Sequence, residues 1–293
     1  MRGLFYSIAI VGGVHVGFAP NVAHANKVDL EPSTSWNIDY APNKCRLARV
    51  YGEGEKRHLL FFEQYWPSSD IGLTIAGPAL SRFKSLKRTY FSTSEAQEPF
   101  RTEPFAGDVE SVGPAVIYSS IDLTKGDTSA EHDAETKLEL LDTKAAQNAT
   151  FIRVRQGGRT VTFKTGPMGD AFGALNECAK SLLTDWGLDV AKHETARQLP
   201  KWQNEAKIVR RIASNYPGNA LNQGEQAIVR MRVMIDETGT VTDCVINEAT
   251  TTQKLESPAC GPMAKAKFAP ALDADGKPFE SYYATGITYR IGG

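Results

Sequence analysis

Short stretches rich in aromatic and branched side chains, separated by turn residues, dominate the first part of the chain. Such stretches predict β-strands, and they cover residues 36–40, 45–51, 58–65 and 73–76. Residues 92–136 hold three prolines, several glycines and many charges around one apolar stretch at 115–123. We therefore predict long loops in that segment, with one or two further strands.

Residues 151–163 carry the pattern of a β-hairpin. The glycine pair at 157–158 favours a two-residue turn, because glycine takes positive φ at little steric cost. A turn there places Val154 opposite Val161 and Ile152 opposite Phe163, so that one face of the hairpin is apolar.

A helix is predicted directly after the hairpin. We expect its N-cap at Asp170, and Gly187 suits the position that follows a helix C-terminus. Apolar side chains recur at helical spacing between these points, and Cys178 shares their face. Residues 191–214 are more polar and form a predicted linker, with a helix whose apolar stripe is Trp202, Ala206, Val209 and Ala213.

The last part of the chain predicts a small β-β-α-β unit. Residues 226–236 alternate, with four apolar side chains on one face and Arg230 and Arg232 on the other. A turn at 236–239 leads to a second strand at 240–246. A helix beginning at Ser257-Pro258 and a final strand at 281–291 complete the unit. The fold class is therefore α+β, with a β-rich N-terminal domain that ends in a hairpin and a helix.

The first residues predict export. An apolar run at 4–18 follows Arg2, and Ala23 and Ala25 fit the −3 and −1 positions of a signal-peptidase site. The predicted organisation is a signal peptide at 1–25, a β-rich domain at 27–190, the linker at 191–214 and a C-terminal domain at 215–293. The alternative is an uncleaved segment that anchors the chain in the inner membrane.

Charge and cysteine content refine this picture. The 33 Lys and Arg residues nearly balance the 34 Asp and Glu residues, so no basic surface points to nucleic acid. In an oxidising compartment the four cysteines tend to pair, and one bridge in each domain predicts Cys45–Cys178 and Cys244–Cys260. Free or metal-bound thiols are the alternative, although the chain contains no C-x-x-C motif.

Several short motifs near the C-terminus resemble the TonB C-terminal domain. They are Tyr216-Pro217, Ile235-Asp236, Gly239-Thr240-Val241, Phe268-Ala269-Pro270-Ala271, Asp275-Gly276 and an aromatic last strand. The resemblance covers residues 210–293, and the pair Cys244 and Cys260 resembles a disulfide-bearing branch of the family. Pro262 departs from the pattern, because a proline inside a helix removes a backbone hydrogen bond.

The resemblance implies a periplasmic protein that contacts segments of outer-membrane receptors or other envelope proteins. Energy transducers of this family also carry an inner-membrane helix with a Ser and a His, and a Pro-rich spacer. Here Ser7 and His15 lie in the segment expected to be cleaved, and a folded domain replaces the spacer. An anchored transducer for transmembrane transport therefore remains the alternative function.

The last strand is the candidate site for such contacts. In a three-stranded sheet two strands are edges, and residues 281–290 contain no proline or lysine and one charge. We expect one row of its side chains to pack on the helix and the other to stay exposed. An envelope protein could add a strand to this edge. The alternative is that the N-terminal domain, the linker helix or a second copy of the chain, as in a homodimer, covers it. The predicted contact residues are Tyr282, Tyr283, Thr285, Ile287 and Tyr289.

Enzyme motifs do not accompany these features. The chain has no G-x-S-x-G, no H-E-x-x-H and no phosphate-binding loop, so we expect neither a cofactor, a metal nor catalysis. His58 and His132 lie near carboxylates, and we expect both to be solvated on the surface. The competing hypothesis is an enzyme or inhibitor centred on the N-terminal domain, and a pH-dependent activity abolished by His58→Ala would favour it.

Overall fold

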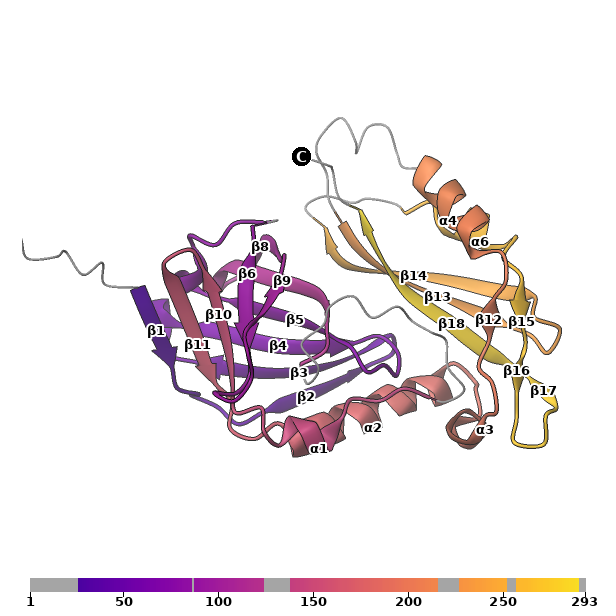
Figure 1. Cartoon of the computed structure of the whole chain (residues 1–293), viewed down its shortest axis with the longest axis horizontal. Helices are drawn as coiled ribbons and strands as arrows, with labels where there is room; N and C mark the ends of the chain where they lie inside the picture. The colour runs from indigo at the N-terminus through magenta and orange to yellow at the C-terminus, as the bar shows by residue number, and fades with distance from the viewer. Residues whose placement is uncertain (1–25, 86, 124–137, 216–226, 252–256, 290–293) are drawn as a thin grey trace, which may run out of the picture.

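The computed structural model describes residues 26–85, 87–123, 138–215, 227–251 and 257–289. The predicted signal peptide at 1–25 lies outside them. The fold is α+β, as predicted (Figure 1). Its larger hydrophobic core uses residues between Cys45 and Leu182, and a second core uses residues between Ile208 and Phe268. We refer to the parts of the chain built around these cores as the N-terminal and C-terminal regions.

A six-stranded antiparallel sheet contains the four strands that were predicted first. Its order is β2-β3-β4-β5-β9-β8. The strands are β2 (Asn37–Ala41), β3 (Lys44–Tyr51), β4 (His58–Gln64), β5 (Ile71–Ala76), β8 (Phe105–Val109) and β9 (Gly113–Ile121). In β9, Ser119 and Ser120 both lie opposite Gly72, which makes a β-bulge.

The second sheet of the N-terminal region has five strands in the order β1-β11-β10-β6-β7. They are β1 (Asn26–Leu30), β6 (Thr89–Ser92), β7 (Phe100–Thr102), β10 (Phe151–Gln156) and β11 (Arg159–Lys164). The prediction for residues 92–136 was wrong in its strand number, because β7, β8 and β9 all lie there. The prolines that suggested loops precede β7 and β8 or stand second in β9, so none of them interrupts a strand.

The hairpin β10–β11 has the predicted register. Val154 pairs with Val161 and Ile152 with Phe163, and all four side chains are buried. Gly157 takes a φ of 58°, as the turn requires. Register is fixed here because a one-residue slip would turn this apolar row to solvent.

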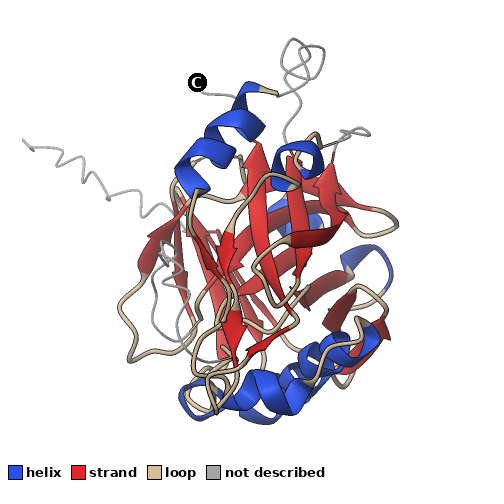
Figure 2. Cartoon of the chain, turned by 90° about the vertical axis from the view of Figure 1, so that its right-hand side faces the viewer, coloured by secondary structure: helices blue, strands red, loops and turns tan. Residues whose placement is uncertain are grey.

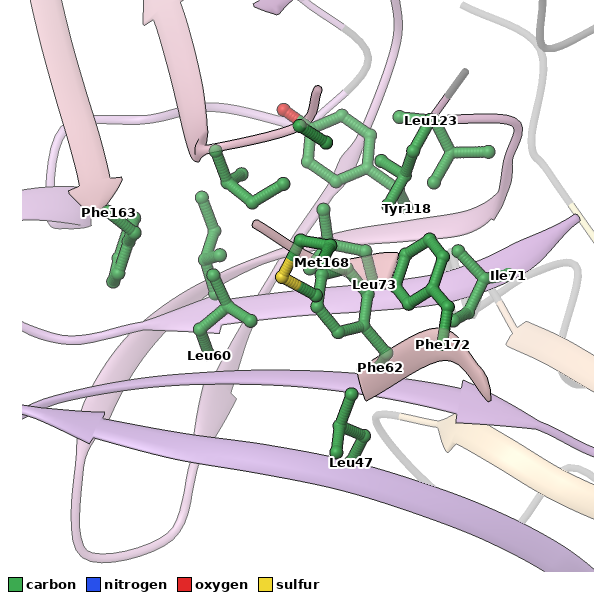
Figure 3. Packing of buried hydrophobic residues seen from close by; sticks show 14 of the residues in the cluster. Leu47, Leu60, Phe62, Ile71, Leu73, Tyr118, Leu123, Phe163, Met168 and Phe172 are labelled. Carbon is green, nitrogen blue, oxygen red and sulfur yellow. The ribbon is translucent and has the colours of Figure 1, made fainter. Parts of the chain in front are cut away.

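The two sheets face each other across one core. Phe163 of β11 meets Tyr51 of β3 edge-on at 5.1 Å between ring centroids, and Phe91 of β6 meets Tyr118 of β9 at 5.6 Å. Figure 3 shows Leu60, Phe62 and Leu73 gathered with Phe163, Met168 and Phe172 in this core. Mutual burial of aromatic and branched side chains therefore joins the sheets.

Helix α2 (Gly169–Asp185) covers the β2–β3 side of this core and is tied to it covalently. Its N-cap is Met168 rather than Asp170, which lies in the first turn. A disulfide joins Cys178 of α2 to Cys45 of β3, as predicted. Gly187, with a φ of 80°, follows the helix C-terminus. The short helices of this region are η1 (Gly54–Lys56), η2 (Pro78–Leu80) and α1 (Thr143–Ala146).

The segment between the two cores packs against the C-terminal one. It contains α3 (Val190–Thr195), β12 (Lys201–Trp202) and α4 (Glu205–Ser214). The predicted stripe of α4 was wrong, because Ile208 and Ile212 are its buried residues and Val209 is 46% exposed. The helix begins after Trp202, so this residue of the predicted stripe is not part of it. Ile208 and Ile212 bury more apolar area than Ala206 and Ala213, so the two isoleucines determine which face of α4 is turned inward.

The C-terminal sheet has three strands in the order β14-β13-β18. They are β13 (Ala227–Ile235), β14 (Val241–Thr251) and β18 (Ser281–Tyr289), joined through α6 (Cys260–Met263). Short ribbons add β15 (Phe268–Ala269), β16 (Ala271–Leu272) and β17 (Pro278–Phe279).

Helices α4 and α6 cover one face of this sheet, where Met231, Val233 and Ile235 are buried (Figure 1). The predicted disulfide Cys244–Cys260 ties β14 to α6. Helix α6 starts three residues later than predicted and spans one turn that contains Pro262.

Figure 2 shows most of the helices at the top and bottom of the molecule, with strands between them. Within the described parts of the chain, no helix has the length and apolar character needed to cross a membrane.

Candidate functional site

Strand β18 is an edge strand, as predicted. It pairs with β13 along its whole length in regular register, with Val233 opposite Tyr283 and Val229 opposite Ile287. Among the described residues, no backbone group forms a hydrogen bond to β18 from its other side. The described residues therefore leave the outer row of N–H and C=O groups on β18 unpaired.

The five predicted contact residues have different surroundings within β18. Tyr283 and Ile287 pack on the second core, and Tyr283 meets Trp202 at 5.2 Å between ring centroids. Burial raises the pKa of Tyr283 to about 12. Thr285 is half-buried, and the side chain of Tyr289 lies outside the described atoms. The row of β18 that contains Tyr283 and Ile287 therefore packs on the second core, beneath α4 and α6.

The other row of β18, which starts with Tyr282, does not stay exposed as predicted, because Tyr282 contacts the N-terminal region at the end of α2 and the joining segment in α3. Tyr282 packs against Trp186 at 5.2 Å and against His193 at 5.9 Å between ring centroids. Only towards its C-terminal end, at Gly286 and Thr288, is β18 exposed. Sequence periodicity separates the two faces of a strand but cannot show what covers the outer face.

His193 is completely buried at the start of β18. Its Nδ1 lies 2.7 Å from the carbonyl oxygen of Asp189, and its Nε2 lies 2.9 Å from Oγ of Ser281. Its ring also meets Phe279 edge-on at 5.0 Å. Burial lowers the pKa of His193, although the bond to Asp189 opposes this effect. The neutral imidazole thus ties α3 to β18.

Two arginines extend from the outward face of β13 to the N-terminal region. The guanidinium carbon of Arg232 lies 3.9 Å from the ring centroid of Trp186. Arg230 reaches further, and its Nη2 donates a hydrogen bond to the carbonyl oxygen of Ser119 at the bulge in β9. The outward face of the C-terminal sheet therefore rests on the N-terminal region.

Arg230 is 8% exposed, and desolvation lowers its pKa. Its guanidinium carbon lies 5.5 Å from the ring centroid of Tyr65 and 5.9 Å from that of Trp66. These distances suit cation–π attraction, which offsets part of the cost of burying the charge. Its Nε has no hydrogen-bond partner.

A cavity of about 200 Å³ lies beside this guanidinium, between the two regions. Residues of β4, β5 and β9 and of the segment after β4 form one wall, and Arg230 with Thr285, Gly286 and Thr288 forms the other. The candidate site thus combines an open strand edge with a small polar cavity next to it.

Residues 213–291 match the family model of the Gram-negative bacterial TonB protein C-terminal. This region is a TonB C-terminal domain. The match confirms the resemblance read from the sequence, and the disulfide Cys244–Cys260 lies within it. Comparison with curated proteins found no match to the chain.

A TonB-like domain is a protein-interaction domain of the envelope of Gram-negative bacteria, and two disulfides fit that oxidising location. The match covers β13 to β18 and the end of α4. It does not extend to the N-terminal region, whose role has to be inferred from its contacts with the TonB-like domain.

His58 is a buried residue, so the expectation of a solvated surface histidine was wrong. It is 4% exposed, its Nδ1 lies 2.8 Å from the carbonyl oxygen of Lys56, and its Nε2 accepts a hydrogen bond from the backbone N–H of Ala79. Desolvation lowers its pKa. Both ring nitrogens thus serve the fold. His132 lies outside the described residues.

The described parts of the chain contain no cluster of three or more His, Cys, Asp or Glu side chains that could hold a metal ion. Sequence reasoning missed the group around Arg230. The signals were Arg230 and Arg232 within an otherwise apolar strand and Gly286 within an aromatic one. Neither signal shows that the two positions are neighbours until β13 and β18 are paired.

Proposed function

We propose that this protein is a periplasmic interaction protein that binds an extended segment of an envelope or outer-membrane protein by adding it to β18. The observation that carries the proposal is the open outer edge of β18 in a TonB-like domain. Main-chain hydrogen bonds would supply affinity, and side chains next to the edge would supply specificity. In this proposal the chain acts by binding and not by catalysis.

The other edge of the sheet is less suited to strand addition. The pairing of β13 with β14 shifts register at both ends, which places bulges near Thr242 and Ala249 of β14. Bulges twist an edge away from a partner and protect it from pairing. Cys244 also ties β14 to α6. By contrast, β18 runs without a register shift from Ser281 to Tyr289.

A proline scan of β18 tests the proposal. Alternate residues of a strand direct their N–H groups to opposite sides. Thr285→Pro and Ile287→Pro therefore remove donors on one side, and Ala284→Pro and Thr288→Pro remove them on the other. One pair should unfold the TonB-like domain by breaking its bonds to β13. The other pair should leave the fold intact and weaken partner binding by about 1 kcal/mol or more.

Crosslinking in intact cells provides the readout and its control. A photoreactive side chain at Thr288, which is exposed on β18, should capture an envelope protein. The same probe at Thr242, which is exposed on β14, should not capture it. If the folded proline variants capture the same protein from Thr288 as the parent does, strand addition at β18 is not the mechanism.

A further inference from the structure

We propose that the cavity between the two regions is a binding site for a carboxylate group, and that the guanidinium of Arg230 binds it. The cavity has a volume of about 200 Å³. Much of its wall comes from the N-terminal region, outside residues 213–291, so the family match does not assign it.

The charge on Arg230 is the first argument. The side chain is 8% exposed, and no described carboxylate forms an ion pair with it. Burying an ion without a counter-ion is costly, and proteins normally pair such groups. The carboxylate of Glu63 favours the charged guanidinium only from a distance, and a carboxylate in the cavity would add a counter-charge in contact with it.

The donors on Arg230 are the second argument. One Nη2–H bond goes to the carbonyl oxygen of Ser119, and Nε–H has no partner. A guanidinium carries five N–H donors in a planar fork that matches the two oxygens of a carboxylate. Arg230 therefore keeps donor capacity where the cavity opens beside it.

Two carboxylates in the cavity wall are engaged elsewhere. Oε1 of Glu63 accepts from Nζ of Lys44 at 2.9 Å and from Nη2 of Arg46 at 2.7 Å. Its charge is thus balanced by two cations. Oδ2 of Asp70 accepts from Oγ of Ser120 at 2.7 Å.

The size and walls of the cavity limit the rest of the ligand. Pockets for drug-sized ligands are roughly 300–1,000 Å³, so this cavity suits a group of amino-acid size. The rings of Tyr65 and Trp66 hold the guanidinium and offer apolar surface to a short aliphatic chain. Two kinds of ligand can supply the carboxylate. One is a free small acid, and the other is an acidic side chain of a peptide bound along β18. Thr285 and Thr288 line the same cavity.

Paired probes test the site in the full mature chain. N-acetylglycine carries one carboxylate, and N-acetylglycinamide replaces it with a neutral amide. Two eight-residue peptides of alternating Val and Thr, with Glu or Gln at the centre, test the second source. Binding is measured by titration calorimetry and by the NMR signal of the Arg230 Nε–H group. The acid should bind roughly tenfold or more tightly than the amide, because hydrogen bonds to charged groups are the stronger ones.

Substitutions identify the binding group. Arg230→Gln should abolish the preference for the carboxylate. Arg232→Gln is the matched control, since it lies on the same strand face but stacks on Trp186, and it should keep the preference. If Arg230→Gln does not fold, the comparison of acid with amide in the parent chain still decides the question.

The outcomes also separate this site from strand addition. Preference for N-acetylglycine supports a free acid, and preference for the Glu peptide alone supports an acidic side chain on β18. Folded proline variants of β18 that lose peptide binding but still bind N-acetylglycine would show two sites. If neither pair of probes is distinguished by the parent chain, the carboxylate site does not exist.

Discussion

Gly286 lies directly opposite Arg230 in the C-terminal sheet, and the guanidinium of Arg230 occupies the space that a side chain at position 286 would need. The absence of a side chain on the edge strand lets an arginine of the central strand cross it. The guanidinium then reaches the bulge at Ser119, more than a hundred residues away in sequence. The hydrogen bond from Arg230 to Ser119, for which Gly286 leaves room, therefore joins the TonB-like domain to the N-terminal region.

Gly286→Ala should displace this guanidinium, because the new Cβ would lie against Nη1 of Arg230. The end of this flexible side chain can move aside, so the main cost is the lost hydrogen bond from Arg230 to Ser119, and the free energy of unfolding should fall by about 1 kcal/mol. Gly173→Ala in α2 is the matched control. A Cβ at position 173 meets no atom within 4 Å, so this variant should be as stable as the parent or slightly more stable. Urea unfolding of both variants provides the comparison.

The two disulfides should stabilise different parts of the chain. Cys244 and Cys260 are 16 residues apart, which in the chain-entropy model corresponds to about 3 kcal/mol. Replacing both with alanine should lower the thermal transition of the TonB-like domain and leave the N-terminal transition nearly unchanged. Removal of the Cys45–Cys178 bridge should do the reverse, with roughly 5 kcal/mol for its 133-residue separation. Scanning calorimetry resolves the two transitions, and a single shared shift would contradict this assignment.

Stability should fall when the pH drops below 6.5, because His193 is buried in its neutral form. Burial holds its pKa below the ordinary value of 6.5, so the unfolded chain takes up a proton more readily than the folded one. The stabilisation is complete above pH 6.5 and is lost as the pH falls towards the folded-state pKa. Urea unfolding at pH 7.5 and pH 5.5 measures the difference. His193→Gln should reduce this pH dependence, and His58 should contribute to the part that remains, because burial lowers its pKa in the same direction.

The exported protein should begin at Asn26 or within a few residues of it. Ala23 and Ala25 meet the small-residue requirement of signal peptidase, and Ala25→Tyr should block cleavage at that site. N-terminal sequencing of protein from the periplasmic fraction measures the start. Recovery of Met1 from the membrane fraction would favour an anchored transducer instead.

Local pattern was sufficient for much of the fold. The hairpin at residues 151–163 kept its predicted register because an apolar row on one face allows a single pairing. The first four predicted strands follow from similar near-neighbour signals. The two disulfides followed from the assignment of one bridge to each domain, and the TonB-like domain followed from its resemblance to the family. The strand number in residues 92–136 was not predictable in the same way, because prolines next to strand ends look the same in sequence as prolines in loops.

The candidate site depended on tertiary structure. Sequence alone predicted a final strand at 281–291 that forms an edge of the sheet, but the prediction that its second row stays exposed was wrong. Docking of the two regions decided that Tyr282 meets Trp186 and that Arg230 passes Gly286 to reach Ser119. These contacts join residues far apart in the chain, and no local pattern encodes them. Periodicity along a strand specifies which side chains share a face, whereas the packing of separate cores decides what that face contacts.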